Sequence, residues 1–198
     1  HRRVTALDLG GMGLVGMIPP EMGNLSFLSF LNISHNKFHG SLPFELAHLR
    51  RLKAMSMRVN YISGEIPSSL GMLQELQHLD IAHNSLTGNI PSNLSNCRRL
   101  QILALSSNVL SGQIPEGIGR LSFIQGLDLG RNHLTGSIPL DIFNISSLQI
   151  MWLGNNKLTG SLPNNLCNGI KSITEISLPN NYLTGEIPVN LASCKNLQ

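Results

Sequence analysis

The chain has 198 residues, of which 13% are charged and 41% are hydrophobic, and its net charge is +3. Charged residues are only about half as frequent as in an average soluble domain, and the chain lacks a Lys/Arg block of the kind that follows nucleic-acid phosphates. No apolar run approaches the ~18 residues of a membrane span. Nucleic acid is therefore not an expected partner, and the core must be aliphatic, because aromatic residues make up only 5% of the chain.

A 24-residue repeat organises the whole chain. Segments begin at residues 1, 25, 49, 73, 97, 121, 145 and 170, and a ninth begins at residue 194. One extra residue in the stretch 166–169 is the only departure from the period. A single coil cannot bury its own leucines, whereas stacked coils can. We therefore predict one solenoid segment, residues 1–198, of about eight coils.

Each coil follows the pattern LxxLxxLxLxxNxLxGxIPxxL, and its parts predict local structure in chain order. The LxL element, as in Leu79-Asp80-Ile81, alternates like a strand with one buried face. The following asparagine can bond backbone groups where the chain turns away from the strand. Glycine permits close approach of the backbone, and proline then ends local pairing. We expect short helical or irregular turns opposite the strands, and buried amides at Asn36, Asn60, Asn84, Asn108, Asn132 and Asn156.

The LxGxIP half-repeat, as in residues 134–139, resembles the plant-specific leucine-rich repeat. The resemblance implies an α/β solenoid, a curved right-handed superhelix with a concave parallel β-sheet, here with both caps missing. The opening Arg3-Val4-Thr5-Ala6-Leu7-Asp8-Leu9 resembles the first coil of plant receptor-like kinase ectodomains. The nearest subfamily in character senses bacterial proteins such as flagellin and elongation factor Tu, which suggests a role in innate immunity.

This resemblance implies an extracellular, apoplastic segment whose parent carries a membrane span and a Ser/Thr kinase elsewhere. It also implies a peptide or protein ligand and a leucine-rich-repeat co-receptor kinase as partners. Soluble plant inhibitors of polygalacturonases share the repeat and form the alternative. A third interpretation makes these coils a spacer within a longer solenoid. Since the chain opens at His1 without a signal peptide, we expect a mature or excised segment.

Three columns of side chains are predicted to point onto the concave face, because they flank the buried positions of the strands. They run Ala6, Phe30, Ala54, His78, Ile102, Gly126, Ile150, Glu175; then Asp8, Asn32, Ser56, Asp80, Ala104, Asp128, Trp152, Ser177; then Gly10, Ser34, Arg58, Ala82, Ser106, Gly130, Gly154, Pro179. Aromatic and arginine side chains are the usual energetic centres of interfaces. The candidate ligand-binding residues are therefore Arg58, His78, Asp80, Ile102, Asp128, Ile150 and Trp152.

Four Asn-X-Ser sequons predict N-glycosylation sites, at Asn24, Asn32, Asn93 and Asn144. Three of them are expected to be accessible, whereas Asn32 belongs to a concave column. A sugar there would shield the first coils and direct ligand binding toward later ones.

The three cysteines are expected to be buried, reduced thiols. Cys97 and Cys194 share the apolar first position of a coil but lie four coils apart, too far for a disulfide. Cys167 and Cys194 are close to one coil apart, and a bridge between them stays open.

No catalytic, cofactor or metal site is predicted. The sequence Gly11-Met12-Gly13-Leu14-Val15-Gly16 matches a dinucleotide-binding pattern, but Pro19 and Pro20 occupy the place of the phosphate-binding helix. His35 and His83 share a phase two coils apart, and no Cys/His cluster has metal-ligand spacing.

Arginine pairs recur in the same two phases of alternate coils, at Arg2-Arg3, Arg50-Arg51 and Arg98-Arg99. They predict a basic stripe along one lateral edge. A solvated face is the simpler interpretation; contact with an acidic ligand tail, pectic carbohydrate or a co-receptor edge is the alternative.

Overall fold

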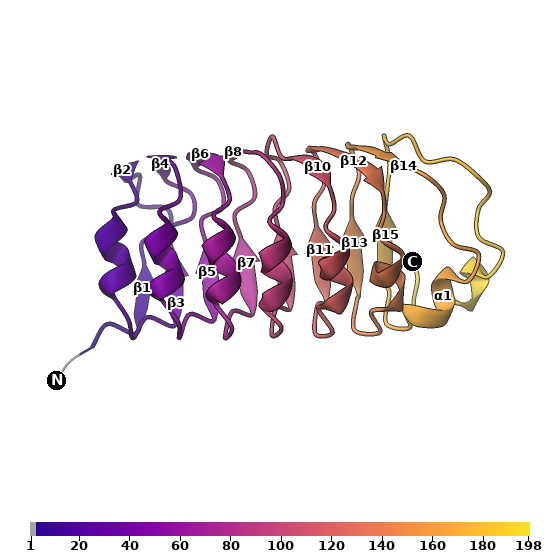
Figure 1. Ribbon diagram of the computed structural model, residues 1–198, viewed down its shortest axis with the longest axis horizontal. Helices are drawn as coiled ribbons and strands as arrows, with labels where there is room; N and C mark the ends of the chain where they lie inside the picture. Colours follow the sequence, from indigo (N-terminus) through magenta and orange to yellow (C-terminus); the bar gives the residue numbers. More distant parts are fainter. Residues whose placement is uncertain (1–2) are drawn as a thin grey trace.

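The computed structural model describes residues 3–198 as a single stack of coils (Figure 1). One parallel sheet runs along the stack, and its eight strands follow one another in chain order. They are β1 (Ala6–Asp8), β3 (Phe30–Asn32), β5 (Ala54–Ser56), β7 (His78–Asp80), β9 (Ile102–Ala104), β11 (Gly126–Asp128), β13 (Ile150–Trp152) and β15 (Glu175–Ser177). Each residue pairs with the residue one repeat later, so the predicted register is confirmed.

A second set of strands, which the repeat did not predict, forms just before the prolines. It comprises β2 (Val15–Met17), β4 (Lys37–Gly40), β6 (Tyr61–Glu65) and β8 (Ser85–Thr87), then β10 (Ser111–Gln113), β12 (His133–Ser137) and β14 (Lys157–Thr159). Figure 1 places these strands along one edge of the stack. The repeated glycine makes the pairing possible. Gly88 has φ 75°, and a Cβ there would lie 2.9 Å from Glu65 Cγ in the preceding coil.

Short helices cover the side of the stack opposite the long sheet. Each of the first six begins directly after the repeated proline, whose fixed φ suits the entry to a helix. The 3₁₀ helices are η1 (Pro20–Asn24), η2 (Phe44–His48), η3 (Ser68–Met72), η4 (Ser92–Asn96), η5 (Glu116–Arg120), η6 (Leu140–Asn144) and η7 (Leu191–Ser193). In the seventh coil an α-helix, α1 (Leu166–Gly169), takes their place, at the position of the extra residue.

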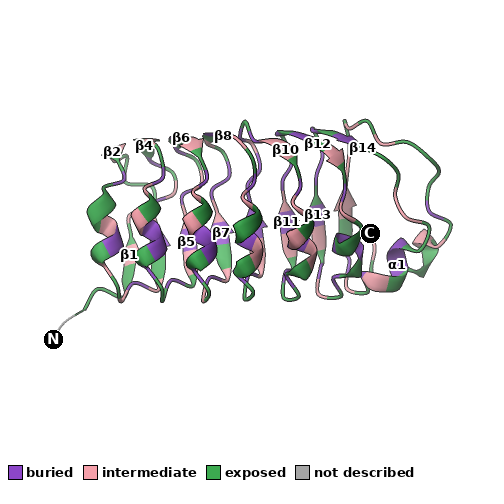
Figure 2. Ribbon diagram, in the orientation of Figure 1, coloured by how far each residue is buried: buried purple, intermediate pink, exposed green. Residues whose placement is uncertain are grey.

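The core is a continuous column of aliphatic side chains between the two layers. Figure 2 shows buried residues in the strands and helices along the stack. Leu31, Met55, Leu79, Leu103 and Leu127, from five successive strands, are all buried. This burial explains why the low aromatic content does not weaken the fold, because every coil adds a similar aliphatic layer.

The asparagine ladder has the predicted role. The Asn108 amide donates to the backbone oxygens of Leu105, at 3.0 Å, and of Ile81 in the preceding coil, at 3.1 Å. Its side-chain oxygen accepts the Leu86 N–H at 3.0 Å. Buried positions in the ladder are Asn36, Asn60, Asn108, Asn132 and Asn156. The expectation was wrong for Asn84, which is only half-buried although it makes the equivalent bonds.

Candidate functional site

The strand register brings the predicted concave residues side by side. In the first column, Ile102 pairs with Gly126, which pairs with Ile150. In the second column, Asp80, Ala104, Asp128 and Trp152 follow one another across β7, β9, β11 and β13. These side chains come from residues up to 72 positions apart in the sequence (80 to 152). The period of the repeat is therefore what assembles the surface.

An apolar strip lies across β9, β11 and β13. Trp152 remains 39% exposed at the outer face of the sheet. Ile102 and Ile150 are both partly exposed on either side of Gly126. A Cβ on Gly126 would lie 2.9 Å from Ile102 Cδ1, so the isoleucine side chain leans over the glycine toward β13. The strip is thus continuous over three strands, and we define it as the residues Ile102, Ile150 and Trp152.

A polar hollow of ≈ 390 Å³ adjoins Trp152. Arg58 and Asp128, two of the predicted site residues, line it together with Trp152. Asp128 accepts a hydrogen bond from the Ser106 hydroxyl, which holds the carboxylate in place. A cationic, an anionic and an aromatic side chain therefore line one hollow, a combination able to orient a polar ligand.

Asp80 lies on β7, two strands from Asp128 and three strands from Trp152, and the pKa of its carboxyl group is perturbed. Burial raises the pKa of Asp80 above its usual value, and the hydrogen bond from the Ala82 N–H and the charge of Arg58 oppose that rise. The negative charge of the Asp128 carboxylate raises the pKa of Asp80 further. A cationic ligand group in this position would relieve the repulsion between the two carboxylates.

A fourth column of side chains, which the repeat pattern did not predict, completes the hollow. His83, Ser107, Arg131 and Asn155 also line it, and each immediately precedes a ladder asparagine. All four residues have φ between 53° and 57°, in the left-handed region. This conformation turns the backbone so that the side chain lies beside the concave strands. The position before the repeated asparagine was the available signal.

Not every concave position is accessible. Ala104 and Ser106 are buried, at 8% and 7% exposure, and Ala82 is fully buried. Ala104 lies between Asp80 and Asp128, whose larger side chains cover it. His78 is exposed on β7, but it does not line the hollow. The structure therefore joins Arg58, Asp128 and Trp152 in the hollow and leaves His78, Asp80, Ile102 and Ile150 beside it.

The four sequons differ in exposure, and the three that were expected to be accessible are exposed. Asn24, Asn93 and Asn144 are exposed on or at the end of 3₁₀ helices. Asn32 is only partly exposed; its amide donates to Asp8 at 2.8 Å, and its oxygen accepts from Ser34. The Asn32 amide is thus already engaged in the sheet surface and less accessible than the other three.

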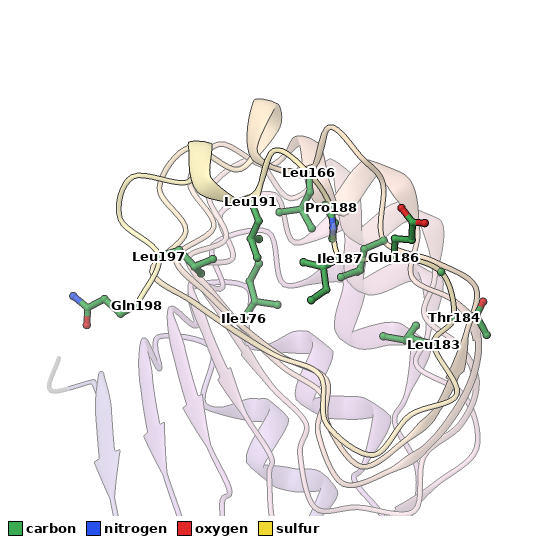
Figure 3. Close-up of a pocket in the computed structure, with 12 residues that line it drawn as sticks. Leu166, Ile176, Leu183, Thr184, Glu186, Ile187, Pro188, Leu191, Leu197 and Gln198 are labelled. Carbon is green, nitrogen blue, oxygen red and sulfur yellow. The ribbon is translucent and has the colours of Figure 1, made fainter.

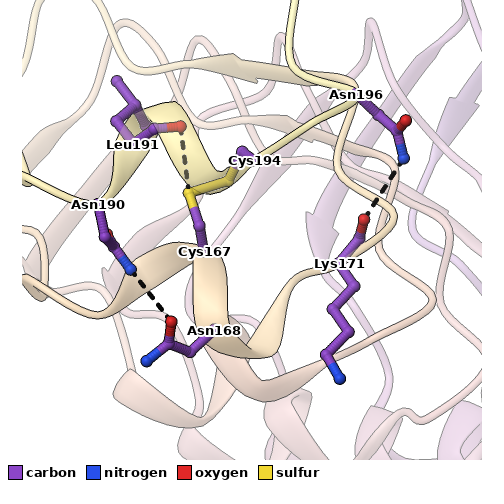
Figure 4. Close-up of a disulfide and its surroundings, with 7 residues drawn as sticks. All are labelled: Cys167, Asn168, Lys171, Asn190, Leu191, Cys194 and Asn196. Atoms are coloured by element: carbon purple, nitrogen blue, oxygen red, sulfur yellow. Dashed lines mark hydrogen bonds between the residues drawn. A yellow bond between two sulfur atoms is a disulfide. The ribbon is translucent and has the colours of Figure 1, made fainter.

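The cysteine expectation was correct for one residue and wrong for two. Cys97 is fully buried and free, and burial raises the pKa of its thiol to about 11. Cys167 and Cys194 form a disulfide, with their Cα atoms 5.1 Å apart (Figure 4). The extra residue converts the local 3₁₀ helix to α1, which brings Cys167 next to the residue after η7. Counting the repeat located the extra residue at 166–169, but it did not show which way the Cys167 side chain would point.

An apolar hollow of ≈ 410 Å³ lies at the C-terminal end of the stack, on the core side of the last coil (Figure 3). Leu166, Ile176, Leu183 and Leu191 are among its lining residues. Their equivalents in interior coils are core residues packed against the next coil, as Leu134 and Leu158 are. We therefore assign this hollow to coil stacking and not to a ligand.

The predicted basic stripe is present on the edge between the helices and the concave strands. Arg3 and Arg51 both lie over the Phe27 ring, 3.8 and 4.4 Å from its centroid. Arg2 lies outside the described residues. Within residues 3–198, no three His, Cys, Asp or Glu side chains are placed to hold a metal ion. The same part of the chain contains no helix long and apolar enough to span a membrane.

Comparison with known families identifies the class of protein that this geometry defines. The Leucine Rich Repeat family matches at residues 27–49, 75–97, 99–121, 123–145, 147–168 and 172–194. These segments make up more than half of the chain, which therefore belongs to the leucine-rich-repeat family. The fold is a binding scaffold and not a catalytic one.

The curated relatives that match parts of the chain are plant receptors. A receptor-like protein kinase of Arabidopsis thaliana is 58% identical over 45 residues, which are 23% of this chain and 4% of that protein. The LRR receptor-like serine/threonine-protein kinase EFR, also of Arabidopsis thaliana, is 45% identical over 53 residues, 27% of this chain and 5% of EFR. The chain thus matches a small part of each relative.

Solved structures agree over nearly the whole chain. The ectodomain of the plant membrane receptor kinase GASSHO1/SCHENGEN3 from Arabidopsis thaliana, in complex with CASPARIAN STRIP INTEGRITY FACTOR 2, is 41% identical with a TM-score of 0.96. The match covers 99% of this chain and 23% of that one. The Arabidopsis receptor kinase HAESA, in complex with the peptide hormone IDA and the co-receptor SERK1, is 29% identical with a TM-score of 0.80. That match covers 99% of this chain and 37% of the HAESA chain.

Proposed function

We propose that this chain is a ligand-recognition segment of a plant receptor-like kinase ectodomain, and that it binds an extended peptide or a protein elicitor across β5 to β13. The observation that carries the proposal is the apolar strip of Ile102, Ile150 and Trp152 beside the hollow of Arg58 and Asp128. These side chains do not form the buried aliphatic core, so the fold does not require their apolar and charged character.

The concave surface combines an apolar strip with a charged hollow, and this combination suits a peptide ligand. The strip supplies an apolar anchor, and partly exposed aromatic residues commonly dominate binding energy. Arg58, Arg131 and Asp128 supply charges of both signs within one hollow, which would fix the direction of a charged chain. Two solved relatives, GASSHO1/SCHENGEN3 and HAESA, are receptor kinases in complex with CASPARIAN STRIP INTEGRITY FACTOR 2 and a peptide hormone, respectively.

The relatives support finer parts of this proposal. Similarity to EFR over 27% of the chain supports the subfamily that senses bacterial proteins. The HAESA complex contains a co-receptor, which supports a leucine-rich-repeat co-receptor kinase as a second partner. An apoplastic location, a membrane span in the parent and glycans at Asn24, Asn93 and Asn144 belong to the same proposal.

The test uses the full ectodomain of the parent and a random peptide library displayed on phage. Peptides enriched on the unaltered ectodomain are synthesised, and their Kd values are measured for the Trp152→Ala, Arg58→Ala and Lys157→Ala variants. Trp152→Ala should weaken binding by ~2 kcal/mol or more, about thirtyfold. Lys157 is exposed on β14, outside the concave columns, so its variant should bind normally.

Thermal unfolding should be nearly unchanged in all three variants, because none of these side chains is buried. Undiminished binding by both Trp152→Ala and Arg58→Ala would reject this strip as the site. The coils would then be a spacer or the surface of an inhibitor that grips a folded enzyme. Failure of the unaltered ectodomain to enrich any peptide family would equally reject a peptide ligand.

A further inference from the structure

A second candidate surface lies on the edge where each 3₁₀ helix leads into the next concave strand. We call it the arginine rim and define it by the residues Arg3, Arg50, Arg51, Arg98, Arg99 and Arg120. The rim segments 24–29, 48–53, 72–77, 96–101 and 120–125 contain Glu75 as their one acidic side chain. The edge therefore carries far more positive charge than the net +3 of the whole chain suggests.

The opposite end of the helices carries the compensating charge. Glu21, Glu45, Glu116 and Asp141 all lie in the first turn of their helices, whereas His48 and Arg120 lie in the last turn. This arrangement follows the helix dipole, which favours anions at the start and cations at the end. It separates the charges across the convex face, so that the rim presents a positive field of its own.

Several rim guanidinium groups are held in place. Phe27 lies between Arg3 and Arg51 in the neighbouring coils, and both contact its ring. Arg50 Nη1 donates to the Met72 backbone oxygen at 2.9 Å. Fixed side chains lose less conformational entropy when a ligand binds, so the rim is partly preorganised for an anion.

An open hollow of ≈ 550 Å³ lies between the third and fifth coils, and its lining includes Arg50, Arg98 and Arg99. Arg99 pairs with Glu75, the one ion pair found within residues 3–198. Arg50 and Arg98 face the same hollow without a carboxylate partner in that part of the chain. The hollow can therefore accept further negative charge.

The spacing of the charges indicates the kind of anion. Arg50 and Arg98 occupy equivalent positions two coils apart, ~10 Å by strand spacing, and Arg3 and Arg51 repeat the same interval. Phe123 lies in the rim segment 120–125, three residues after Arg120, and is 59% exposed, so it offers an aromatic face to the C–H side of a sugar ring. A regular ligand with repeated carboxylates matches a regular row of cations better than a folded protein does.

We propose that the arginine rim binds a linear polyuronate, an acidic polysaccharide whose carboxylates repeat along an extended chain. The binding is electrostatic, shallow and built from repeated weak contacts, so it weakens steeply as salt increases. It is independent of the concave site, and a receptor with both surfaces could hold a wall polymer and a peptide together.

The test measures binding of the full ectodomain to immobilised polygalacturonate at low and at physiological salt. The Arg50→Gln/Arg98→Gln variant should lose about tenfold in affinity, as expected for two exposed charge contacts. The matched control, Lys37→Gln/Lys157→Gln, removes the same charge from the second sheet and should bind within about twofold of the unaltered protein. Circular dichroism checks the fold of each. If loss of the Arg50–Met72 contact disturbs it, Arg98→Gln alone serves.

Polygalacturonate with methyl-esterified carboxylates should bind weakly, because its repeating charge is removed. Equal binding of the esterified polymer would overturn the proposal, as would equal losses in the rim variant and the control. Polyglutamate serves as the acidic-peptide probe. If it binds as tightly as polygalacturonate and Phe123→Ala weakens neither, the rim recognises acidic peptides and the polyuronate proposal is wrong.

Discussion

The sixth and eighth coils share one motif but have different structures. Residues 134–139 read LTGSIP and residues 183–188 read LTGEIP. In the sixth coil this stretch forms β12 between β10 and β14, and Ile138 is 6% exposed. In the eighth coil no strand forms there, and Ile187 is 78% exposed. The motif therefore does not bury its own isoleucine; a neighbouring coil on each side does.

The disulfide sits where this difference begins. Cys167 and Cys194 tie α1 to the segment after η7, and a weaker hydrogen bond from Asn196 to the Lys171 oxygen, at 3.5 Å, lies nearby (Figure 4). Interior coils have no such bond and rely on stacking and on the asparagine ladder. The covalent link therefore adds a constraint on the last two coils that the first six do not have.

The largest expected effect comes from removing that link. Cys194→Ser opens a loop with a sequence separation of 27 residues, for which loop entropy predicts a loss of about 3–4 kcal/mol. The loss should be confined to residues after 166. Hydrogen exchange measured along the chain should show faster exchange in the last two coils and unchanged exchange in the first six. Uniformly faster exchange would mean that the solenoid unfolds as one unit.

A pair of isoleucine variants tests the comparison itself. Ile138→Ala should lower the free energy of unfolding by about 3 kcal/mol, since it leaves a cavity in the core. Ile187→Ala, at the equivalent exposed position, should lower it by no more than about 0.5 kcal/mol. Urea denaturation measures both. Similar losses in the two variants would show that Ile187 is packed in solution and that the eighth coil resembles the interior.

The smallest effect concerns backbone strain in the third coil. Val59 has φ 55°, a conformation unfavourable for a β-branched residue. Its N–H donates to Ala82 at 3.0 Å, which holds it there. Val59→Asn should stabilise the protein by about 1 kcal/mol, while Asn155→Val, at the equivalent position of the seventh coil, should destabilise it by a similar amount. A destabilised Val59→Asn protein would show that Val59 packing outweighs the strain.

The repeat predicted much of the structure because a strict period fixes register. The pairing of every concave strand, the bonds of Asn108 and the burial of Cys97 all follow from phase. The disulfide could not be decided, since one extra residue near Cys167 changes the local helix and the direction of the side chain. The expectation of reduced thiols there was wrong for that reason.

The repeat pattern also could not predict which side chains on the concave face are accessible. Ala104 and Ser106 have the correct phase but are covered by larger neighbours such as Asp128. The left-handed residues Arg131 and His83 enter the hollow because of a backbone turn that hydrophobic periodicity does not encode. Side-chain size and backbone conformation in adjacent coils decide these points, and both depend on contacts between repeats.

Whether the concave strip is the recognition site is tested most directly by a crystal structure of the full ectodomain with a peptide selected on it. We predict that the peptide crosses β5 to β13, with an apolar side chain against Trp152 and a charged group in the hollow of Arg58 and Asp128. A peptide bound instead to the second sheet, to the helices or to the apolar hollow at residues 162–198 would contradict the proposed site.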